Sequence, residues 1–155
     1  MNVSLFERAE IVIEIYGAML CLLSALFLIR SKMNRKSVKW MIAMLITNTF
    51  TLVFEAWSYF LQGNEGQVSL VCAIVVNFIM FVSYGLEIAW AVKFVIALNE
   101  ENGAKISKIY MAIIWFFLAC CLFILVVNLF TGFMYYFDEN NIYHRNFLWY
   151  VYTGF

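Results

Sequence analysis

The chain has 155 residues, of which 65% are hydrophobic, 19% are aromatic and 13% are charged, and its formal net charge is zero. A soluble domain typically has about 45–50% apolar and about 25% charged residues, and a core of this size cannot enclose so many apolar side chains. The composition therefore excludes an ordinary soluble domain and predicts a chain surrounded by lipid. The balanced charge gives no indication of a nucleic-acid partner.

Apolar stretches long enough to cross a bilayer occupy most of the chain. A spanning helix needs about 20 mainly apolar residues, and complete spans are expected at residues 9–29, 40–61, 68–90 and 109–130. The third apolar run goes on to residue 98, so we expect its end to extend into the cytoplasm, and residues 147–155 begin a fifth helix too short to cross. The sequence predicts one all-α membrane domain over residues 1–155, a polytopic helical bundle, and indicates an N-terminal fragment of a longer protein.

A strongly basic loop follows the first span. Its charges are Arg30, Lys32, Arg35, Lys36 and Lys39. Loops rich in lysine and arginine stay in the cytoplasm, and such a loop acts as the topogenic signal. With this loop inside, only Arg8 and Arg145 of the ten lysines and arginines lie outside. We therefore expect a multi-pass protein of the plasma membrane, with lipid as its main partner and its N-terminus outside.

Polar residues recur at helical spacing within the first two spans. In the first span they are Glu10, Glu14, Gly17, Cys21 and Ser24, and in the second Thr47, Asn48, Thr51, Glu55 and Ser58. Because polar groups that face lipid are costly, we expect these two stripes to meet, with Gly17, Cys21 and Ser24 as a helix-packing face. Glu14, Asn48 and Glu55 are candidates for sensing a small ligand or a proton from outside; the alternative is hydrogen bonding that only holds the helices together.

The third span offers a further polar face at Asn77, Tyr84 and Glu87. We expect Glu87 near the inner interface, where it would reach the headgroups or pair with a cation of the basic loop such as Lys39 or Arg35.

The segment between the fourth and fifth spans combines aromatic residues with an acidic, asparagine-rich turn. His144 and Arg145 follow this turn and are further candidates for sensing a ligand or a proton, and either could reach Glu14 or Glu55. No EF-hand pattern is present, and a single histidine makes a poor metal site. The four cysteines lie in apolar segments without metal-ligand or CxxC spacing, so neither a metal site, a cofactor nor a disulfide framework is expected.

The stretch from Tyr135 to Arg145, YYFDENNIYHR, is followed by an aromatic-rich helix start. It resembles the N-terminal membrane sensor region of signalling proteins of Gram-positive anaerobes. That resemblance implies six to eight helices followed by a cytoplasmic GGDEF-type diguanylate cyclase, EAL-type phosphodiesterase or histidine-kinase module. None of those catalytic motifs occurs here, and neither an HExxH nor a GxSxG motif does, so we expect no enzyme activity from this chain.

The leading hypothesis is therefore a sensory or anchoring module of a bacterial signal-transduction protein, dimerising through its helices. One alternative is a transport or channel subunit, which requires a continuous hydrophilic path across the membrane. The other is a non-catalytic membrane interaction protein that is complete as it stands.

Overall fold

The computed structural model describes residues 5–64 and 66–148 of the chain. Four helices account for most of them: α1 (Leu5–Arg30), α2 (Lys36–Leu61), α3 (Gln67–Glu101) and α4 (Ile109–Thr131). All four are long and apolar enough to cross a membrane, which confirms the prediction of four helices that can span a bilayer.

The helices extend beyond the predicted spans at several ends. Both α1 and α2 begin before their predicted spans, and α3 runs for 35 residues and ends at Glu101 rather than at residue 98. At about 1.5 Å per residue this helix is roughly 52 Å long, well beyond a hydrocarbon core of about 30 Å. The predicted fifth helix, residues 147–155, lies outside the described residues except for Phe147 and Leu148.

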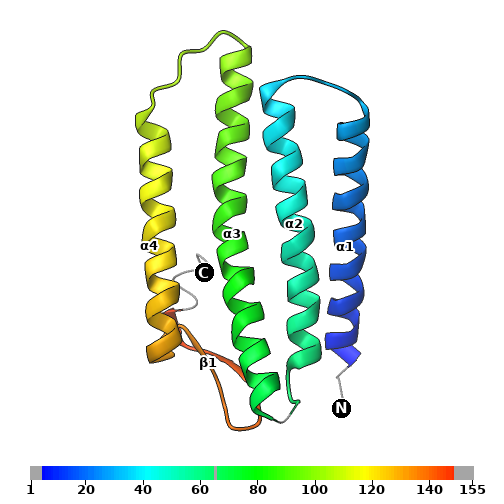
Figure 1. Ribbon diagram of the computed structural model, residues 1–155, viewed down its shortest axis with the longest axis vertical. Coiled ribbons are helices and arrows are strands. Elements are labelled where there is room, and N and C mark those ends of the chain that lie inside the picture. Colours follow the sequence, from blue (N-terminus) through cyan, green and yellow to red (C-terminus); the bar gives the residue numbers. More distant parts are fainter. Residues whose placement is uncertain (1–4, 65, 149–155) are drawn as a thin grey trace.

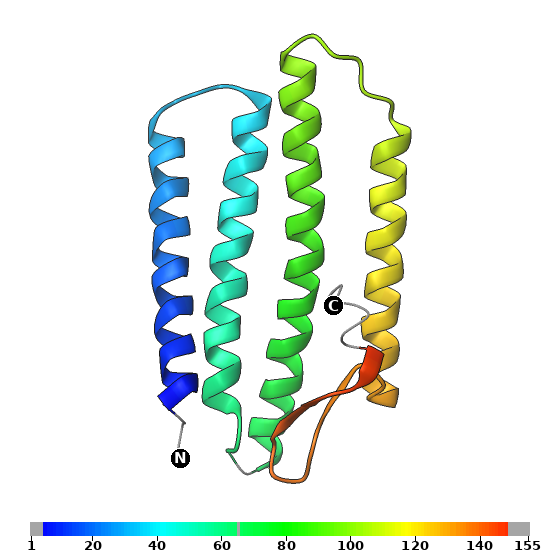
Figure 2. The same ribbon diagram turned by 180° about the vertical axis from the view of Figure 1, so that it is seen from behind.

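The helices lie side by side in one row, in chain order, and neighbours run antiparallel (Figure 1). The view from behind in Figure 2 shows the same row. Extensive contacts join α1 to α2 and α2 to α3 in the described part of the chain, and α3 contacts α4 much less. We call the end with the α2–α3 turn the hairpin end and the end with loops 31–35 and 102–108 the basic end. The helices thus form an open row rather than a closed bundle.

A two-stranded antiparallel sheet follows α4, and the sequence pattern does not predict it. Strand β1 (Tyr135–Phe137) pairs with β2 (Tyr143–Arg145), and we call residues 132–146 the hairpin. Gly132 ends α4 in the left-handed conformation, with φ of 62°, and Asn141 adopts the same conformation in the turn between the strands, with φ of 58°. Glycine and asparagine are the residues that adopt this conformation most readily, so both reversals of the chain have a local cause.

The main buried cluster lies where α3, α4 and β1 meet. Its members are Met80, Phe81, Leu125, Met134 and Tyr135. The rings of Tyr135 and Phe81 stack with 5.1 Å between their centroids. Elsewhere the helices expose large apolar side chains, among them Phe116, Phe123 and Phe130 on α4, which suit contact with lipid.

Candidate functional site

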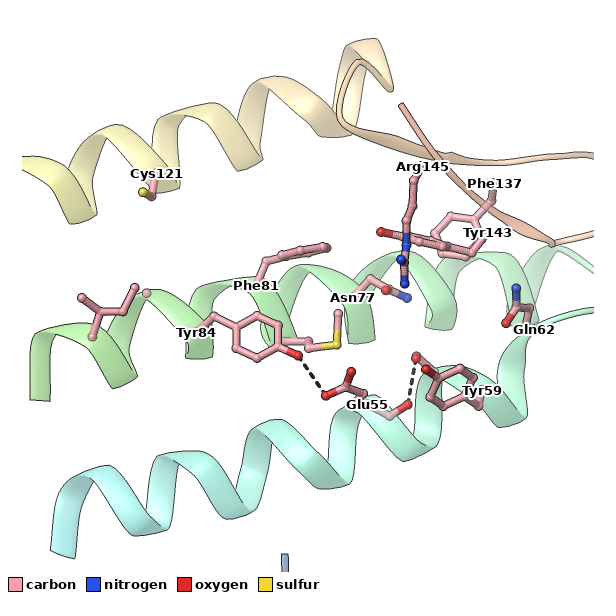
Figure 3. A pocket seen from close by; sticks show the side chains of 14 residues that line it. Glu55, Tyr59, Gln62, Asn77, Phe81, Tyr84, Cys121, Phe137, Tyr143 and Arg145 are labelled. Carbon is pink, nitrogen blue, oxygen red and sulfur yellow. Dashed lines mark hydrogen bonds between the residues drawn. The ribbon is translucent and has the colours of Figure 1, made fainter. Parts of the chain in front are cut away.

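A pocket of about 550 Å³ lies among α2, α3, α4 and the hairpin (Figure 3). Polar and apolar side chains both line it: Glu55, Ser58, Tyr59, Gln62, Asn77, Met80, Phe81, Tyr84, Gly85, Ile88, Cys121, Phe137, Tyr143 and Arg145. Ligand pockets typically have about 300–1,000 Å³ and apolar walls with a few converging polar groups. This cavity has both features and is the principal candidate site among the described residues.

Glu55 supplies the acidic group of the pocket from α2. The hydroxyl of Tyr84, on α3, donates a hydrogen bond of 2.9 Å to its Oε2 (Figure 3). The hydroxyl of Ser58, which also lines the pocket, donates to the backbone carbonyl of Glu55 at 2.8 Å. A carboxyl group within a spanning helix requires protonation, a partner or water. The tyrosine provides a partner that also fixes the direction in which the carboxyl group points.

Arg145 supplies the basic group of the pocket from the other side. Its side chain extends from β2 toward Asn77 on α3 (Figure 3), and its positive charge acts on the carboxylate of Glu55. Side chains of a strand alternate between its two faces. Tyr143 and Arg145 therefore share the face that lines the pocket, and His144 between them does not line it.

The hairpin is fixed over the pocket by two buried asparagines. Oδ1 of Asn128 accepts hydrogen bonds from the backbone N–H groups of Met134, at 2.7 Å, and Tyr135, at 3.3 Å, and its Nδ2 donates to the Tyr135 carbonyl at 3.2 Å. At the far end of the hairpin, Nδ2 of Asn141 donates to the carbonyls of Asn64 and Gly66 in the α2–α3 turn. The hairpin is thus hydrogen-bonded to α4 at one end and to the α2–α3 turn at the other.

His144 has a role within the hairpin itself. Its Nε2 lies 2.9 Å from Oδ2 of Asp138, and its ring stacks on Tyr136 with 5.1 Å between centroids. The hydrogen bond from His144 holds the pKa of the Asp138 carboxyl below its ordinary value. Asp138 Oδ1 also accepts the backbone N–H groups of residues 140 and 142, so this carboxylate organises the turn.

Next to the pocket, a buried hydroxyl has no hydrogen-bond partner among the described residues. It belongs to Tyr135, which is 3% exposed and whose pKa burial raises to about 12, so the hydroxyl keeps its proton at physiological pH. The ring of Tyr135 lies against Phe81 and Tyr143, which both line the pocket. A hydroxyl group that can both donate and accept a hydrogen bond is therefore buried next to residues that line the pocket.

Glu87 accepts a hydrogen bond from the hydroxyl of Thr51, near the middle of α2, rather than pairing with Lys39 or Arg35, and this corrects the expected pairing with the basic loop. The physical reason is that Glu101 at the end of α3, and not Glu87, meets the start of α2. Glu87 also lines a second cavity of about 280 Å³, together with Asn48 and Ile88.

A hydrogen bond joins the polar stripes of α1 and α2 in the described residues. Nδ2 of Asn48 donates to Sγ of Cys21 at 3.4 Å. Gly17 lies close to α2, because a Cβ there would stand 3.1 Å from Cδ1 of Leu52, whereas Ser24 is exposed. Glu14 is half-buried, outside the pocket wall, and close enough to Glu55 for their charges to repel. The residues Thr51 and Glu55 turn instead to α3.

The basic end is held by charged side chains. Both carboxyl oxygens of Glu101, the last residue of α3, accept hydrogen bonds from Ser37: one from its backbone N–H at 2.9 Å and one from its hydroxyl at 2.7 Å. Lys36 and Glu100 form an exposed ion pair at 2.8 Å. Among the predicted topogenic charges, Lys36 therefore takes part in joining α2 to α3. We call these contacts the latch.

About two helical turns before Glu101 on α3, Lys93 lies over three tryptophan rings. Its Nζ is 4.2 Å from the ring centroid of Trp40, 4.9 Å from that of Trp90 and 5.1 Å from that of Trp115. The three rings come from α2, α3 and α4, and Nε1 of Trp90 donates to the hydroxyl of Thr47 at 3.1 Å. A lysine charge within a bilayer is stabilised by such ring faces. The cluster therefore joins three helices through one cation.

Metal chemistry finds no support in the described residues. They contain no group of three histidine, cysteine or acidic side chains that could hold a metal ion, and Cys21, Cys72, Cys120 and Cys121 are free thiols.

Two of the five candidate sensing residues, Glu55 and Arg145, line the same pocket, and Asn48 lines the second cavity. Sequence reasoning did not identify Met80, Phe81 or Gln62 as parts of a site. The only usable signal was the spacing of Asn77, Phe81 and Tyr84, which share one face of α3. Apolar pocket residues cannot be distinguished by sequence from the many other apolar residues of this chain.

No protein-family model, curated protein or solved structure matches the chain. Its resemblance to the sensor regions of bacterial signalling proteins therefore stays a prediction from the sequence.

Proposed function

We propose that the chain is the membrane-embedded sensory module of a bacterial signal-transduction protein. In this proposal it lies in the plasma membrane with the hairpin end outside and the basic end in the cytoplasm, as the distribution of lysine and arginine favours. The observation that supports it most is the pocket of about 550 Å³, where Glu55, Tyr84 and Arg145 converge from three different elements. A small molecule arriving from outside would be taken up there.

The arrangement of the helices provides a way to transmit binding. The pocket lies between α4 with its hairpin on one side and the α2–α3 pair on the other, while the latch ties α2 to α3 at the opposite end. A ligand that fits one spacing of these two parts better than another shifts the population toward that spacing. In a homodimer, such a shift would change how two cytoplasmic output modules face each other.

Accessibility of the pocket provides the direct test. In a variant without the four native cysteines, Ser58→Cys places a thiol in the pocket wall, and Val53→Cys places a matched thiol on the exposed, lipid-facing side of α2. A small cationic, membrane-impermeant methanethiosulfonate applied to intact cells should modify the thiol at position 58 and not the thiol at position 53. Failure to modify position 58 from outside would exclude a ligand site open to the exterior.

A cellular output assay tests the signalling part. Glu55→Gln keeps the size of the side chain and removes its charge, so the output of the protein in its native host should become locked and lose its response to external pH. An output and a pH response identical to those of the unmodified protein would remove Glu55 as the responsive group.

One observation favours transport as a second candidate function. Ile88 lines both cavities, so the pocket with Glu55 and the cavity with Glu87 share one residue of their walls. Movement of that side chain would join the two cavities into a longer polar route. Solute or proton flux into liposomes that contain the purified protein, increased by Ile88→Ala, would support transport and argue against a purely sensory module.

A further inference from the structure

The pocket carries two charges of opposite sign and no other charged lining residue: Glu55 on α2 and Arg145 on β2. They approach from opposite sides of the cavity, with Tyr84 directed at the acid and Asn77 beneath the arginine (Figure 3). A ligand with one charged group would match one wall and be opposed by the other. A ligand with both charges would satisfy both walls at once.

The surroundings of Glu55 strengthen its preference for a cation. The carboxyl group of Glu10, on α1, acts on Glu55, and Glu55 in turn acts on those of Glu14 and Glu87. Neighbouring carboxyl groups disfavour each other's ionisation, and a cation placed among them favours their ionised forms. An added ammonium group would therefore be attracted to Glu55 even with the arginine present, and the ring faces of Tyr84 and Phe81 add favourable contact for a cation.

Arg145 is suited to hold a carboxylate at the mouth of the pocket. A guanidinium has five N–H donors in a planar fork, so it can bind a ligand carboxylate in a bidentate manner and keep another contact as well. Arg145 is exposed in the described structure, and Gln62 and Asn77 lie in the same part of the wall as further polar groups.

Apolar side chains line the remaining pocket wall. Met80, Phe81 and Ile88 come from α3, and Cys121 faces them from α4. A volume of about 550 Å³ accommodates a molecule of amino-acid size with an aromatic or branched body. A small, strongly hydrated zwitterion such as glycine would leave these walls uncovered.

From these four features we infer that the pocket binds zwitterions with an apolar body, the chemistry of a free hydrophobic or aromatic amino acid. The ammonium group lies at Glu55, the carboxylate at Arg145 and the body against Met80, Phe81 and Ile88. This inference rests on the pocket being the ligand site of the proposed function, and it names the class of that ligand.

Three probes that share one indole ring test the charge requirement. Tryptophan carries both charges, tryptamine only the ammonium group and indole-3-propionate only the carboxylate. Calorimetric titration into the full chain in lipid nanodiscs should show that tryptophan binds at least about tenfold more tightly than either of the others, since about tenfold corresponds to a single charge-assisted hydrogen bond. Equal affinity for all three probes, or tightest binding of a singly charged probe, would overturn the inference.

Two substitutions assign each charge. With Glu55→Gln, tryptophan should lose its advantage over indole-3-propionate, and with Arg145→Gln it should lose its advantage over tryptamine. Arg8→Gln is the matched control, because Arg8 is an exposed arginine on α1 that does not line the pocket. Unchanged probe preferences in both pocket variants, with melting temperatures equal to that of the unmodified protein, would refute the assignment.

The accessibility of position 58 separates this inference from the proposed function. If the thiol at position 58 reacts from outside but none of the three probes binds, the ligand class is wrong and the pocket remains a site for other chemistry. If the thiol does not react and no probe binds, the proposed function fails together with the inference.

Discussion

The two ends of the helix row are held together by different means. At the basic end, charged side chains join the helices directly: Glu101 accepts two hydrogen bonds from Ser37, and Lys93 lies over rings from three helices. At the hairpin end, a strand pair bridges α4 and the α2–α3 turn, and a pocket remains beneath it. The basic end therefore depends on contacts between side chains of α2, α3 and α4, whereas the hairpin end combines the buried cluster of α3 and α4 with a hairpin that covers a pocket.

This difference indicates which part of the molecule has room to respond. The pocket contains a polar centre that a ligand can reorganise, whereas the latch and the Lys93 cluster are direct contacts between helices. A substitution at the hairpin end should affect binding, and one at the basic end should affect cohesion of the helices. The following predictions test that division.

The largest effect is expected from Asn128→Ala. Asn128 is 3% exposed, and its loss leaves three hydrogen bonds with the hairpin backbone unmade. Leaving buried polar groups unpaired should cost about 2–4 kcal/mol of stability, and hydrogen exchange should rise in residues 133–146 while the basic end stays protected. Thr131→Ala, in the exposed last turn of α4, is the control. An equal increase in hydrogen exchange at the hairpin end and the basic end of the Asn128→Ala variant would show that the two ends are not independent.

Lys93→Met should have the next largest effect. The substitution keeps the length of the side chain and removes the cation from the three tryptophan rings, at a cost of about 1–2 kcal/mol. The melting temperature in detergent should fall, while affinity for tryptophan in the pocket should not change. Lys93→Arg should retain most of the stability, and Lys105→Met, at an exposed lysine of the next loop, should be neutral. Weaker ligand binding in Lys93→Met would show that the two ends are coupled.

Within the latch, Glu101→Ala should lower the melting temperature more than Lys36→Ala. Glu101 bonds both the backbone and the hydroxyl of Ser37 at the start of α2, where a negative charge also interacts favourably with the helix dipole. The Lys36–Glu100 pair is exposed, with relative side-chain exposures of 61% and 40%, and such pairs contribute little. The reverse order in thermal unfolding would show that the ion pair dominates the latch.

The smallest effect is expected from acid. The pKa of Asp138 is held below its ordinary value by the bond from His144, so its contribution to hairpin stability is fully present above the ordinary aspartate pKa of about 3.9 and is lost as pH falls through the lowered pKa. The melting temperature should therefore fall below about pH 4. Asp138→Asn should lose this acid-dependent part, and an identical acid profile in that variant would assign the effect to another group.

Hydropathy predicted the helices well because each spanning helix must by itself contain enough apolar residues to cross a bilayer. The hairpin was not predicted, since its two strands have only three residues each and depend on contacts with distant segments. Asn141, for example, bonds to the carbonyl of Asn64, which is 77 positions away in the chain. Such a contact leaves no periodic pattern in the sequence.

The pocket was predictable only where charge breaks the apolar pattern. Glu55 and Arg145 could be named because an acid within a span and a cation just outside one are conspicuous. The partner of Glu87 was not predicted because the alignment of a 35-residue helix with its neighbours depends on packing. The pairing of Thr51 with Glu87 is visible only in three dimensions.

The tryptophan stack at the basic end gives this protein a natural optical reporter. The indole rings of Trp40 and Trp90 stand 5.4 Å apart at an interplanar angle of 18°, beside a quenching ammonium group. Chromophores this close share their excited state, so separation of α2 from α3 would alter ultraviolet emission without any attached dye. Separation of the helices at the basic end can thus be followed by intrinsic tryptophan fluorescence.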